Sequence, residues 1–179
     1  MAEGFERKIV LIGYRCTGKT SLGKRLALRL GLPFIDTDAL VEEKAGKTIR
    51  EIIAESGWAF FREREREAIR GLSALRRSVI ATGGGAVLDE ENAALLKKEG
   101  VLIWLVADEE TILRRMRRDA ATGGQRPPLS SDDLRKEITD TLALRTPIYK
   151  RLADLTVATD VAGIDECVAN ILQAVTNKG

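Results

Sequence analysis

The chain has 179 residues, of which 44% are hydrophobic and 31% are charged. This length and composition fit one compact domain with a sizeable core and exclude a disordered chain. The net charge of +2 provides no bulk field that would attract nucleic acid or a membrane surface, and the absence of histidine excludes imidazole catalysis and histidine metal sites.

The lack of a recognisable targeting signal and the spacing of the cysteines favour the cytoplasm. We find no signal-peptide pattern and no run of about 18 apolar residues, so we expect a cytoplasmic protein without a membrane partner. Cys16 and Cys167 lie far apart and lack C-x-x-C spacing, which favours free thiols over a disulfide. Because Cys16 belongs to an amide-rich loop, its thiol pKa could be lowered there.

Short apolar runs alternate with longer amphipathic segments along the whole chain. The predicted strands are residues 8–12, 33–36, 78–81, 101–105 and 155–158. The predicted helices are residues 19–30, 48–55, 58–75, 90–99, 109–118, 132–151 and 164–176. This alternation predicts a single α/β domain whose mostly parallel sheet is covered by helices on both faces, with ligands bound beyond the carboxyl ends of the strands.

The first strand leads directly into Gly-Tyr-Arg-Cys-Thr-Gly-Lys-Thr, a complete G-x-x-x-x-G-K-[ST] loop. A buried strand followed by such a loop and a helix gathers backbone N–H groups around a polyphosphate. Lys19 can reach the β- and γ-phosphates, and the Thr20 hydroxyl can ligate Mg²⁺. The expected nucleotide contacts are Gly13, Tyr14, Arg15, Cys16, Thr17, Gly18, Lys19, Thr20 and Ser21.

Two carboxylates follow the second predicted strand, in Phe-Ile-Asp-Thr-Asp at residues 34–38. One can help to hold Mg²⁺ through water, while the other accepts a hydrogen bond or a proton from a substrate hydroxyl. The alternative is structural, because Asp38 precedes Ala-Leu-Val-Glu and can act as a helix N-cap.

The next two motifs supply a guanidinium and bare backbone. Arg62 follows two phenylalanines in a run of alternating charge, where it can grip a carboxylate or belong to an ordinary solvated helix. Gly83, Gly84 and Gly85 follow the third predicted strand and let a ligand approach the main chain, although a flexible turn is the alternative.

The most basic segment, residues 114–129, ends in a Gly- and Pro-containing loop that carries Arg126. This composition suits a lid that excludes water and brings an arginine onto the transferring phosphoryl group. Nucleic-acid binding is disfavoured because no aromatic residue interleaves with the arginines. Arg145 precedes Pro147 in a helical pattern and either enters a cleft or forms a surface salt bridge.

Taken together, these motifs resemble those of the shikimate kinases. The resemblance runs from about residue 8 to about residue 160. It rests on the phosphate loop, the Asp-x-Asp run, Phe61-Arg62 followed by Glu65, the triple glycine, Arg126-Pro127 and Arg145-Thr146-Pro147-Ile148-Tyr149. Departures from the family pattern are Cys16, where Gly, Ala or Ser is commoner, and a long lid reading Arg-Pro-Pro-Leu.

The resemblance implies a three-layer αβα fold of the nucleoside-monophosphate-kinase type, with a five-stranded parallel sheet in the order 2-3-1-4-5. All 179 residues would form one domain, with a substrate-binding subdomain at about 37–65 and a lid at about 117–130. The enzyme would be a cytoplasmic monomer, with ATP and shikimate as its partners and no nucleic acid. It would transfer the γ-phosphoryl group of ATP to the 3-hydroxyl of shikimate, giving 3-phosphoshikimate and ADP in aromatic amino-acid biosynthesis.

The resemblance also implies residue roles. Asp38 would bind the ring hydroxyls and act as base, and Arg62 and Arg145 would grip the shikimate carboxylate beside Gly83, Gly84 and Gly85. Lys19 and Arg126 would stabilise the transferring phosphate, and Thr20 with Asp36 would hold one Mg²⁺. Arg118, with Arg117 as the alternative, would stack on adenine. The rival functions are another small-molecule kinase, such as a gluconokinase or nucleotide kinase, and a nucleotide-gated regulatory module without catalysis.

Overall fold

The computed structural model describes residues 7–121 and 131–176, and within these ranges the chain forms one parallel sheet. Its strands are β1 (Lys8–Ile12), β2 (Phe34–Asp36), β3 (Val79–Ala81), β4 (Gly100–Val106) and β5 (Leu155–Ala158). The strand order is β2-β3-β1-β4-β5 and every pairing is parallel. The predicted fold class and strand order are confirmed, and each predicted strand coincides with an observed one to within one residue at either end.

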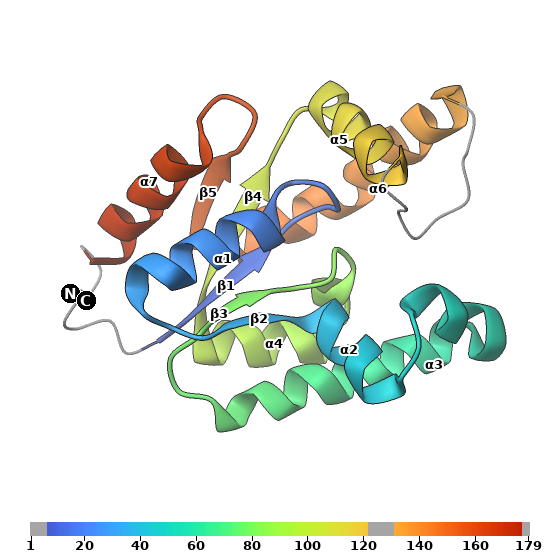
Figure 1. The fold of residues 1–179 in the computed structure, drawn as a ribbon, viewed down its shortest axis with the longest axis horizontal. Coiled ribbons are helices and arrows are strands. Elements are labelled where there is room, and N and C mark those ends of the chain that lie inside the picture. Colours follow the sequence, from blue (N-terminus) through green and yellow to red (C-terminus); the bar gives the residue numbers. More distant parts are fainter. Residues whose placement is uncertain (1–6, 122–130, 177–179) are drawn as a thin grey trace.

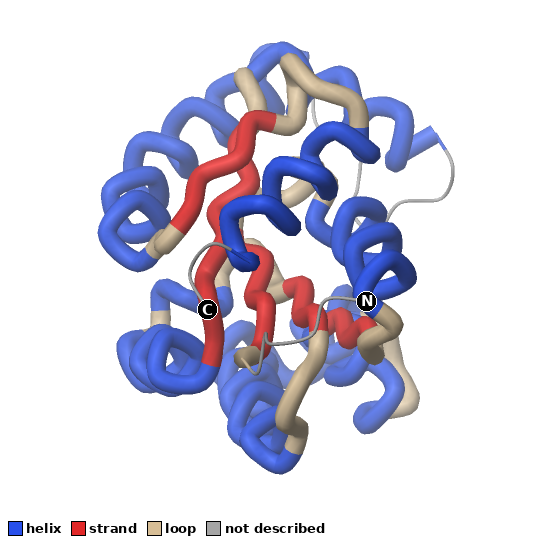
Figure 2. Tube along the Cα trace, turned by 90° about the vertical axis from the view of Figure 1, so that its left-hand side faces the viewer, coloured by secondary structure: helices blue, strands red, loops and turns tan. Residues whose placement is uncertain are grey.

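Helices connect the strands and cover both faces of the sheet. They are α1 (Lys19–Leu30), α2 (Thr37–Ala45), α3 (Ile49–Gly71), α4 (Glu90–Glu99), α5 (Glu109–Ala121), α6 (Ser131–Leu152) and α7 (Ile164–Thr176), with 3₁₀ turns η1 (Leu72–Ala74) and η2 (Ala86–Leu88). Figure 1 shows α1 and α7 above the sheet and α3 and α4 below it. The tube in Figure 2, seen from the side, shows the strands twisting between these two layers.

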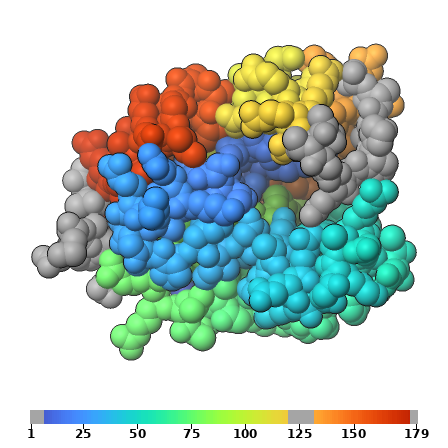
Figure 3. Space-filling view, in the orientation of Figure 1, coloured from blue at the N-terminus to red at the C-terminus, as the bar shows by residue number. Residues whose placement is uncertain are grey.

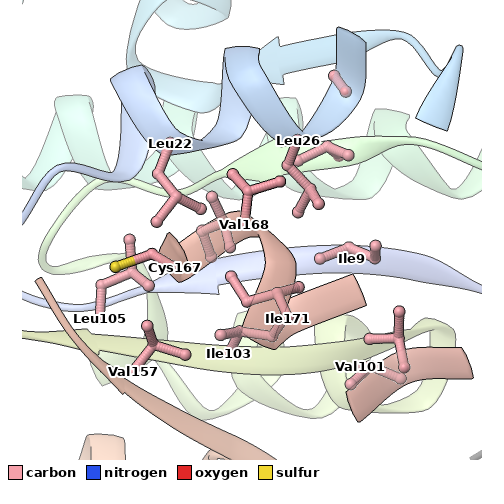
Figure 4. Packing of buried hydrophobic residues seen from close by; sticks show 14 residues of the cluster. Ile9, Leu22, Leu26, Val101, Ile103, Leu105, Val157, Cys167, Val168 and Ile171 are labelled. Atoms are coloured by element: carbon pink, nitrogen blue, oxygen red, sulfur yellow. The ribbon is translucent and has the colours of Figure 1, made fainter. Parts of the chain in front are cut away.

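Two cores form because successive side chains of a strand point to opposite faces. On β1, Ile9 and Leu11 join the core beneath α1 and α7, while Val10 and Ile12 join the core against α3, α4 and α6. Figure 4 shows the first core, where α1 and α7 side chains meet those of β1, β4 and β5. All four β1 side chains are fully buried, as expected for the central strand of a doubly covered sheet.

The second and third predicted helices are joined in the observed structure. Two helices were expected at 48–55 and 58–75, and the structure has a continuous assignment, α3, that contains a non-helical Gly57 with φ of 79°. Glycine accepts this left-handed conformation without steric cost, so the break falls where the prediction placed it. Thr48 begins the first part with a capping box to Glu51, and the second part ends in the 3₁₀ turn η1.

Helix α2 was not among the predicted helices, and its cap corrects the structural alternative for Asp38. The N-cap is Asp36, whose Oδ1 accepts hydrogen bonds from the N–H groups of Asp38 at 3.1 Å and Ala39 at 3.4 Å. Asp38 therefore lies inside the first turn of α2, and its carboxylate is not consumed by capping. This leaves its oxygens available to a ligand.

The sheet brings the ends of its central strands to one edge. Leu11 of β1 and Asp36 of β2 are both in register with Ala81 of β3, so the loops that follow these strands emerge side by side. In the space-filling view, α2 and α3 lie on one side of this loop end and α5 on the other (Figure 3). In the described part of the chain, no helix is sufficiently long and apolar to cross a membrane.

Candidate active site

The loop between β1 and α1 has the geometry of an anion-binding turn. Gly13 has φ of 138°, and a Cβ at this position would meet the carbonyl oxygen of Leu105 at 2.5 Å, so only glycine fits. Cys16 also adopts a positive φ, 60°. Within the loop, the Thr17 hydroxyl donates to the carbonyl oxygen of Tyr14 at 2.8 Å, which fixes the turn before α1 begins.

Lys19 reaches back across this loop from the first turn of α1. Its Nζ donates to the carbonyl oxygens of Gly13 at 2.9 Å and Tyr14 at 2.7 Å, and the residue is 9% exposed. Burial lowers the pKa of the ammonium to about 8, although Asp38 and Asp36 act in the opposite direction. The ammonium is thus held at the loop, close to the carboxylates that follow β2.

Thr20 and Asp36 come together as the predicted metal-binding pair. The Thr20 hydroxyl donates to Asp36 Oδ2 at 2.8 Å, while Oδ1 of the same carboxylate caps α2. Among the described residues no cluster of three or more acidic, cysteine or histidine side chains exists that could hold a metal. One hydroxyl and one carboxylate beside a phosphate loop suit Mg²⁺, which usually takes its remaining ligands from phosphates and water.

Asp38 lies partly buried beside the triple-glycine loop. Its Oδ1 would be 2.5 Å from a Cβ placed on Gly83, so the absence of a side chain there lets the carboxylate approach. Burial raises the pKa of Asp38 to about 6, with further contributions from Asp36 and Glu65, while Lys19 lowers it. This carboxylate is mostly ionised at neutral pH but is a stronger base than an ordinary aspartate.

Glu65 is a buried carboxylate to which the sequence reasoning gave no role beyond its place in the family pattern. It is 1% exposed, and its Oε2 accepts from Arg62 Nη1 at 2.6 Å. Its other oxygen, Oε1, has no hydrogen-bond partner among the described residues and would be 2.9 Å from a Gly83 Cβ. Burial raises the pKa of Glu65, which Arg62 partly opposes.

Arg62 is held by its surroundings, as the functional interpretation of its motif expects. Its guanidinium lies over the rings of Phe61 at 5.1 Å and Trp58 at 5.5 Å, and it would meet a Cβ on Gly85 at 2.6 Å. Its side chain is 28% exposed, so it is neither solvated like a surface arginine nor sequestered from a ligand. Guanidinium groups in such settings bind carboxylates well.

The triple-glycine loop is fixed by contacts from both sides. The Gly83 N–H donates to the Thr37 hydroxyl at 3.0 Å, and the carbonyl oxygen of Gly84 accepts from Arg145 Nη1 at 3.1 Å. A Cβ on Gly84 would lie 3.3 Å from the Arg15 nitrogen, so this loop also contacts the phosphate loop. Gly84 therefore lies where the two loops meet.

Arg145 points into this site and forms no ion pair with the residues that the structure describes. In addition to the Gly84 carbonyl, its guanidinium faces the ring of Tyr14 at 5.8 Å. Tyr14 is 3% exposed and packs with Ile138 of α6. Arg62 and Arg145 are thus brought from α3 and α6 to adjacent glycines of one loop.

The predicted lowering of the Cys16 thiol pKa is wrong. Burial raises it to about 11, helped by Asp119, to which the thiol donates at 3.4 Å, while Arg15 and Lys19 act weakly in the other direction. The loop amides do not compensate for this desolvation and the adjacent carboxylate. Both cysteines are free, as expected.

Helix α5, which precedes the predicted lid, contributes a contact to the phosphate loop from a residue that the sequence analysis did not single out. Arg115 of α5 donates to the carbonyl oxygen of Cys16 at 3.1 Å and to that of Thr159 at 2.6 Å, so it ties α5 to the phosphate loop. Arg117 and Arg118 lie exposed on the same helix. Arg126 lies outside the described residues.

The remaining loop positions are consistent with nucleotide contact. Arg15 forms an ion pair with Glu137 of α6 at 3.0 Å, and Ser21 is exposed in the first turn of α1.

The contacts described above bring together every described residue of the predicted acceptor site. Helical periodicity could not have revealed Glu65 or Arg115, because each lies in a charged run in which several neighbours look equivalent.

Comparison with known proteins gives a consistent result. A family model described as shikimate kinase matches residues 15–176. The shikimate kinase of Syntrophus aciditrophicus is 50% identical, with 96% of this chain and 92% of the relative covered, and that of Symbiobacterium thermophilum is 42% identical, with 96% and 97% covered. The shikimate kinase of Acinetobacter baumannii, solved in complex with shikimate, superposes with a TM-score of 0.89 at 33% identity, covering 99% of this chain and 98% of that one.

Proposed function

The chain belongs to the shikimate kinase family, and we propose that the residues gathered beyond the ends of β1, β2 and β3 form its two substrate sites. The reaction is the ATP-dependent phosphorylation of shikimate in aromatic biosynthesis. The observation that carries the assignment of the acceptor site is the convergence of Arg62 and Arg145 on the triple-glycine loop beside Asp38.

For ATP, the phosphate loop supplies backbone N–H groups and Lys19 supplies the mobile cation. Lys19 exchanges its contacts with the carbonyl oxygens of Gly13 and Tyr14 for the β- and γ-phosphates, whose charge keeps the ammonium protonated. Arg126 of the lid and Arg118 are assigned to the phosphates and the adenine on the resemblance alone. Arg117 is the alternative for the adenine contact, and Arg115, which contacts the phosphate loop directly, is a further candidate for it.

For shikimate, two guanidinium groups receive the carboxylate. Arg62 beside Gly85 and Arg145 beside Gly84 are close enough to the same loop to bind one anion from two directions. Asp38 then faces the ring hydroxyls across Gly83. This arrangement matches a small anionic polyol.

Asp38 is the proposed base. Its raised pKa of about 6 suits it to accept the proton of the 3-hydroxyl as the hydroxyl oxygen bonds to the γ-phosphorus and ADP leaves. Lys19, held near Asp38, offsets the negative charge that develops between the two substrates. Bound Mg²⁺ would neutralise charge on the β- and γ-phosphate oxygens, and Thr20 with Asp36 would hold it.

The experiment is an ADP-release assay with shikimate, gluconate and nucleoside monophosphates in parallel, with and without Mg²⁺. We expect turnover with shikimate and Mg²⁺ only, loss of turnover in Asp38→Asn and Lys19→Ala, and near-normal turnover in Arg66→Lys. Arg66 is a matched control on α3 because its guanidinium pairs with Glu63 and Asp89 and not with a residue of the proposed acceptor site. Full turnover by Asp38→Asn would overturn the assignment of the base.

Three further properties complete the proposal. We assign the enzyme to the cytoplasm, as a monomer, with ATP and shikimate as its only partners and without nucleic acid or membrane. The net charge of +2 and the free thiols support this assignment. Sedimentation of the purified protein at its working concentration tests the oligomeric state.

A further inference from the structure

The carbonyl oxygen of Gly84 accepts a second hydrogen bond, from the hydroxyl of Tyr149. Tyr149 follows Arg145 by one turn of α6, is fully buried, and packs against Trp104 with ring centroids 6.0 Å apart. Both lone pairs of this carbonyl are therefore engaged by α6. The buried Tyr149 side chain therefore fills the core and also fixes the triple-glycine loop through its hydroxyl.

The peptide group between Gly84 and Gly85 is oriented by these contacts. A trans peptide places its C=O and N–H on opposite sides, so a carbonyl held toward α6 directs the Gly85 N–H away from α6. In the described part of the chain, the carbonyls of Gly83 and Gly85 accept from Ala86 and Leu88, and no acceptor contacts the Gly85 N–H. That N–H is a donor left for a ligand beside Arg62.

Glycine-glycine peptides rotate easily, so this orientation needs a lock. We propose that Tyr149 is a positioning residue for shikimate, which holds the Gly84 carbonyl so that the Gly85 N–H faces the acceptor site and Arg145 can turn to the substrate carboxylate. This inference rests on the acceptor site proposed above.

The Tyr149 hydroxyl matters because the Arg145 guanidinium has two acceptors to bind, the Gly84 carbonyl oxygen and the substrate carboxylate. When Arg145 binds a carboxylate, the Gly84 carbonyl keeps Tyr149 as a donor. Without the hydroxyl, the carbonyl either retains Arg145 or is left without a protein donor, and both outcomes weaken the binding of shikimate. The hydrogen bonds of Thr17 and Lys19 that fix the phosphate loop do not involve Tyr149, so we expect ATP affinity to change little even though Gly84 touches that loop.

The test is calorimetric titration of Tyr149→Phe with shikimate and, separately, with ATP and Mg²⁺. We expect the Kd for shikimate to rise about 5- to 10-fold, the worth of one hydrogen bond, and the Kd for ATP to stay within about twofold. Ser78→Ala is the matched control: Ser78 precedes β3, at the end of the strand far from the glycine loop, and its buried hydroxyl has no hydrogen-bond partner in the described part of the chain. It should change neither affinity.

Two further measurements separate the possible failures. Arg145→Met should abolish measurable shikimate binding; if it does not, the acceptor site itself is misassigned. If Arg145→Met abolishes binding while Tyr149→Phe binds shikimate normally, only the role of Tyr149 is overturned. Should Tyr149→Phe fail to fold, hydrogen exchange of the Gly85 amide in the unaltered protein decides: saturating shikimate must protect it, and unchanged exchange refutes the proposal.

Discussion

Replacing Asp38 with asparagine should abolish turnover and at the same time stabilise the protein. The carboxylate has an ordinary pKa of 3.8 and a folded-state pKa of about 6, raised by burial and by its acidic neighbours. Between these pH values the folded protein binds more protons than the unfolded chain, so stability falls as the pH rises from about 4 to about 6. Above about pH 6, Asp38 is ionised in the folded protein as well, and its destabilisation of the fold has reached its full value.

The magnitude follows from the two pKa values. Each pKa unit of difference between folded and unfolded states corresponds to about 1.4 kcal/mol, so ionised Asp38 destabilises the fold by about 3 kcal/mol at most. Asparagine keeps the size of the side chain and carries no charge. We therefore expect Asp38→Asn to gain about 2–3 kcal/mol at pH 7.5, or roughly 4 to 12 °C in Tm for a chain of this length.

The assay is urea unfolding of both proteins at pH 7.5 and at pH 4.5, where Asp38 is protonated in the folded state. The advantage of the variant should shrink by more than half at the lower pH. Glu43→Gln is the control, since Glu43 is an exposed carboxylate of the same helix, and should show no pH-dependent gain. A variant that is less stable than the unaltered protein at pH 7.5, or equally favoured at both pH values, would refute the reasoning.

Three more predictions follow from the same site. Arg62→Lys loses the bidentate grip and should raise the Kd for shikimate by roughly 10- to 150-fold, about 1.5–3 kcal/mol, in a titration that leaves ATP affinity unchanged; an unaltered Kd contradicts the assignment. In a pH–rate profile, kcat/KM should fall below about pH 6 as Asp38 is protonated and above about pH 8 as Lys19 loses its proton, and a profile flat from pH 5 to 7 excludes Asp38 as the base. Gly83→Ala places a Cβ 2.5 Å from Asp38 Oδ1 and should lower kcat/KM by about 100-fold or more. Gly71→Ala is the control: its Cβ would meet Lys44 Nζ at 3.8 Å, and its kcat/KM should be near normal in the same assay.

The acidic residues of the site explain why Asp38 is the appropriate place for such a test. Asp38 and Glu65 both approach Gly83, which puts their oxygens within about 5 to 6 Å of each other in a partly desolvated setting. Within residues 7–121 and 131–176, Glu65 has Arg62 as a partner for one oxygen and no hydrogen-bond partner for the other. Burial first, and then Asp36 and Glu65, raise the pKa of Asp38 and so its basicity at the expense of stability, a cost typical of catalytic sites.

The sheet and the residues at its strand ends could be predicted from sequence because the pattern determines both. Five apolar runs alternating with amphipathic segments admit few topologies, and parallel strands bring their carboxyl ends to one edge. Gly13 follows β1 directly, Asp36 is the last residue of β2, and Gly83 comes two residues after the end of β3, so their proximity followed once the strands were identified. Helix α2 was missed because its short, mixed sequence has little amphipathic periodicity, and Asp36 was not recognised as its cap.

Residues on helices were harder to assign, because what a helical side chain faces depends on packing that no local pattern records. In the run that contains Arg62 and Glu65, arginine and glutamate alternate, and only the packing of α3 against the glycine loop decides which carboxylate is buried. Arg62 and Arg145 were singled out with alternatives open, and their pairing came from the family resemblance. Tyr149 entered the sequence analysis only as the last residue of a family motif, since its one informative contact is with a glycine 65 positions away. Strand ends can therefore be interpreted from sequence alone, whereas the helix residues that complete this site require the three-dimensional structure.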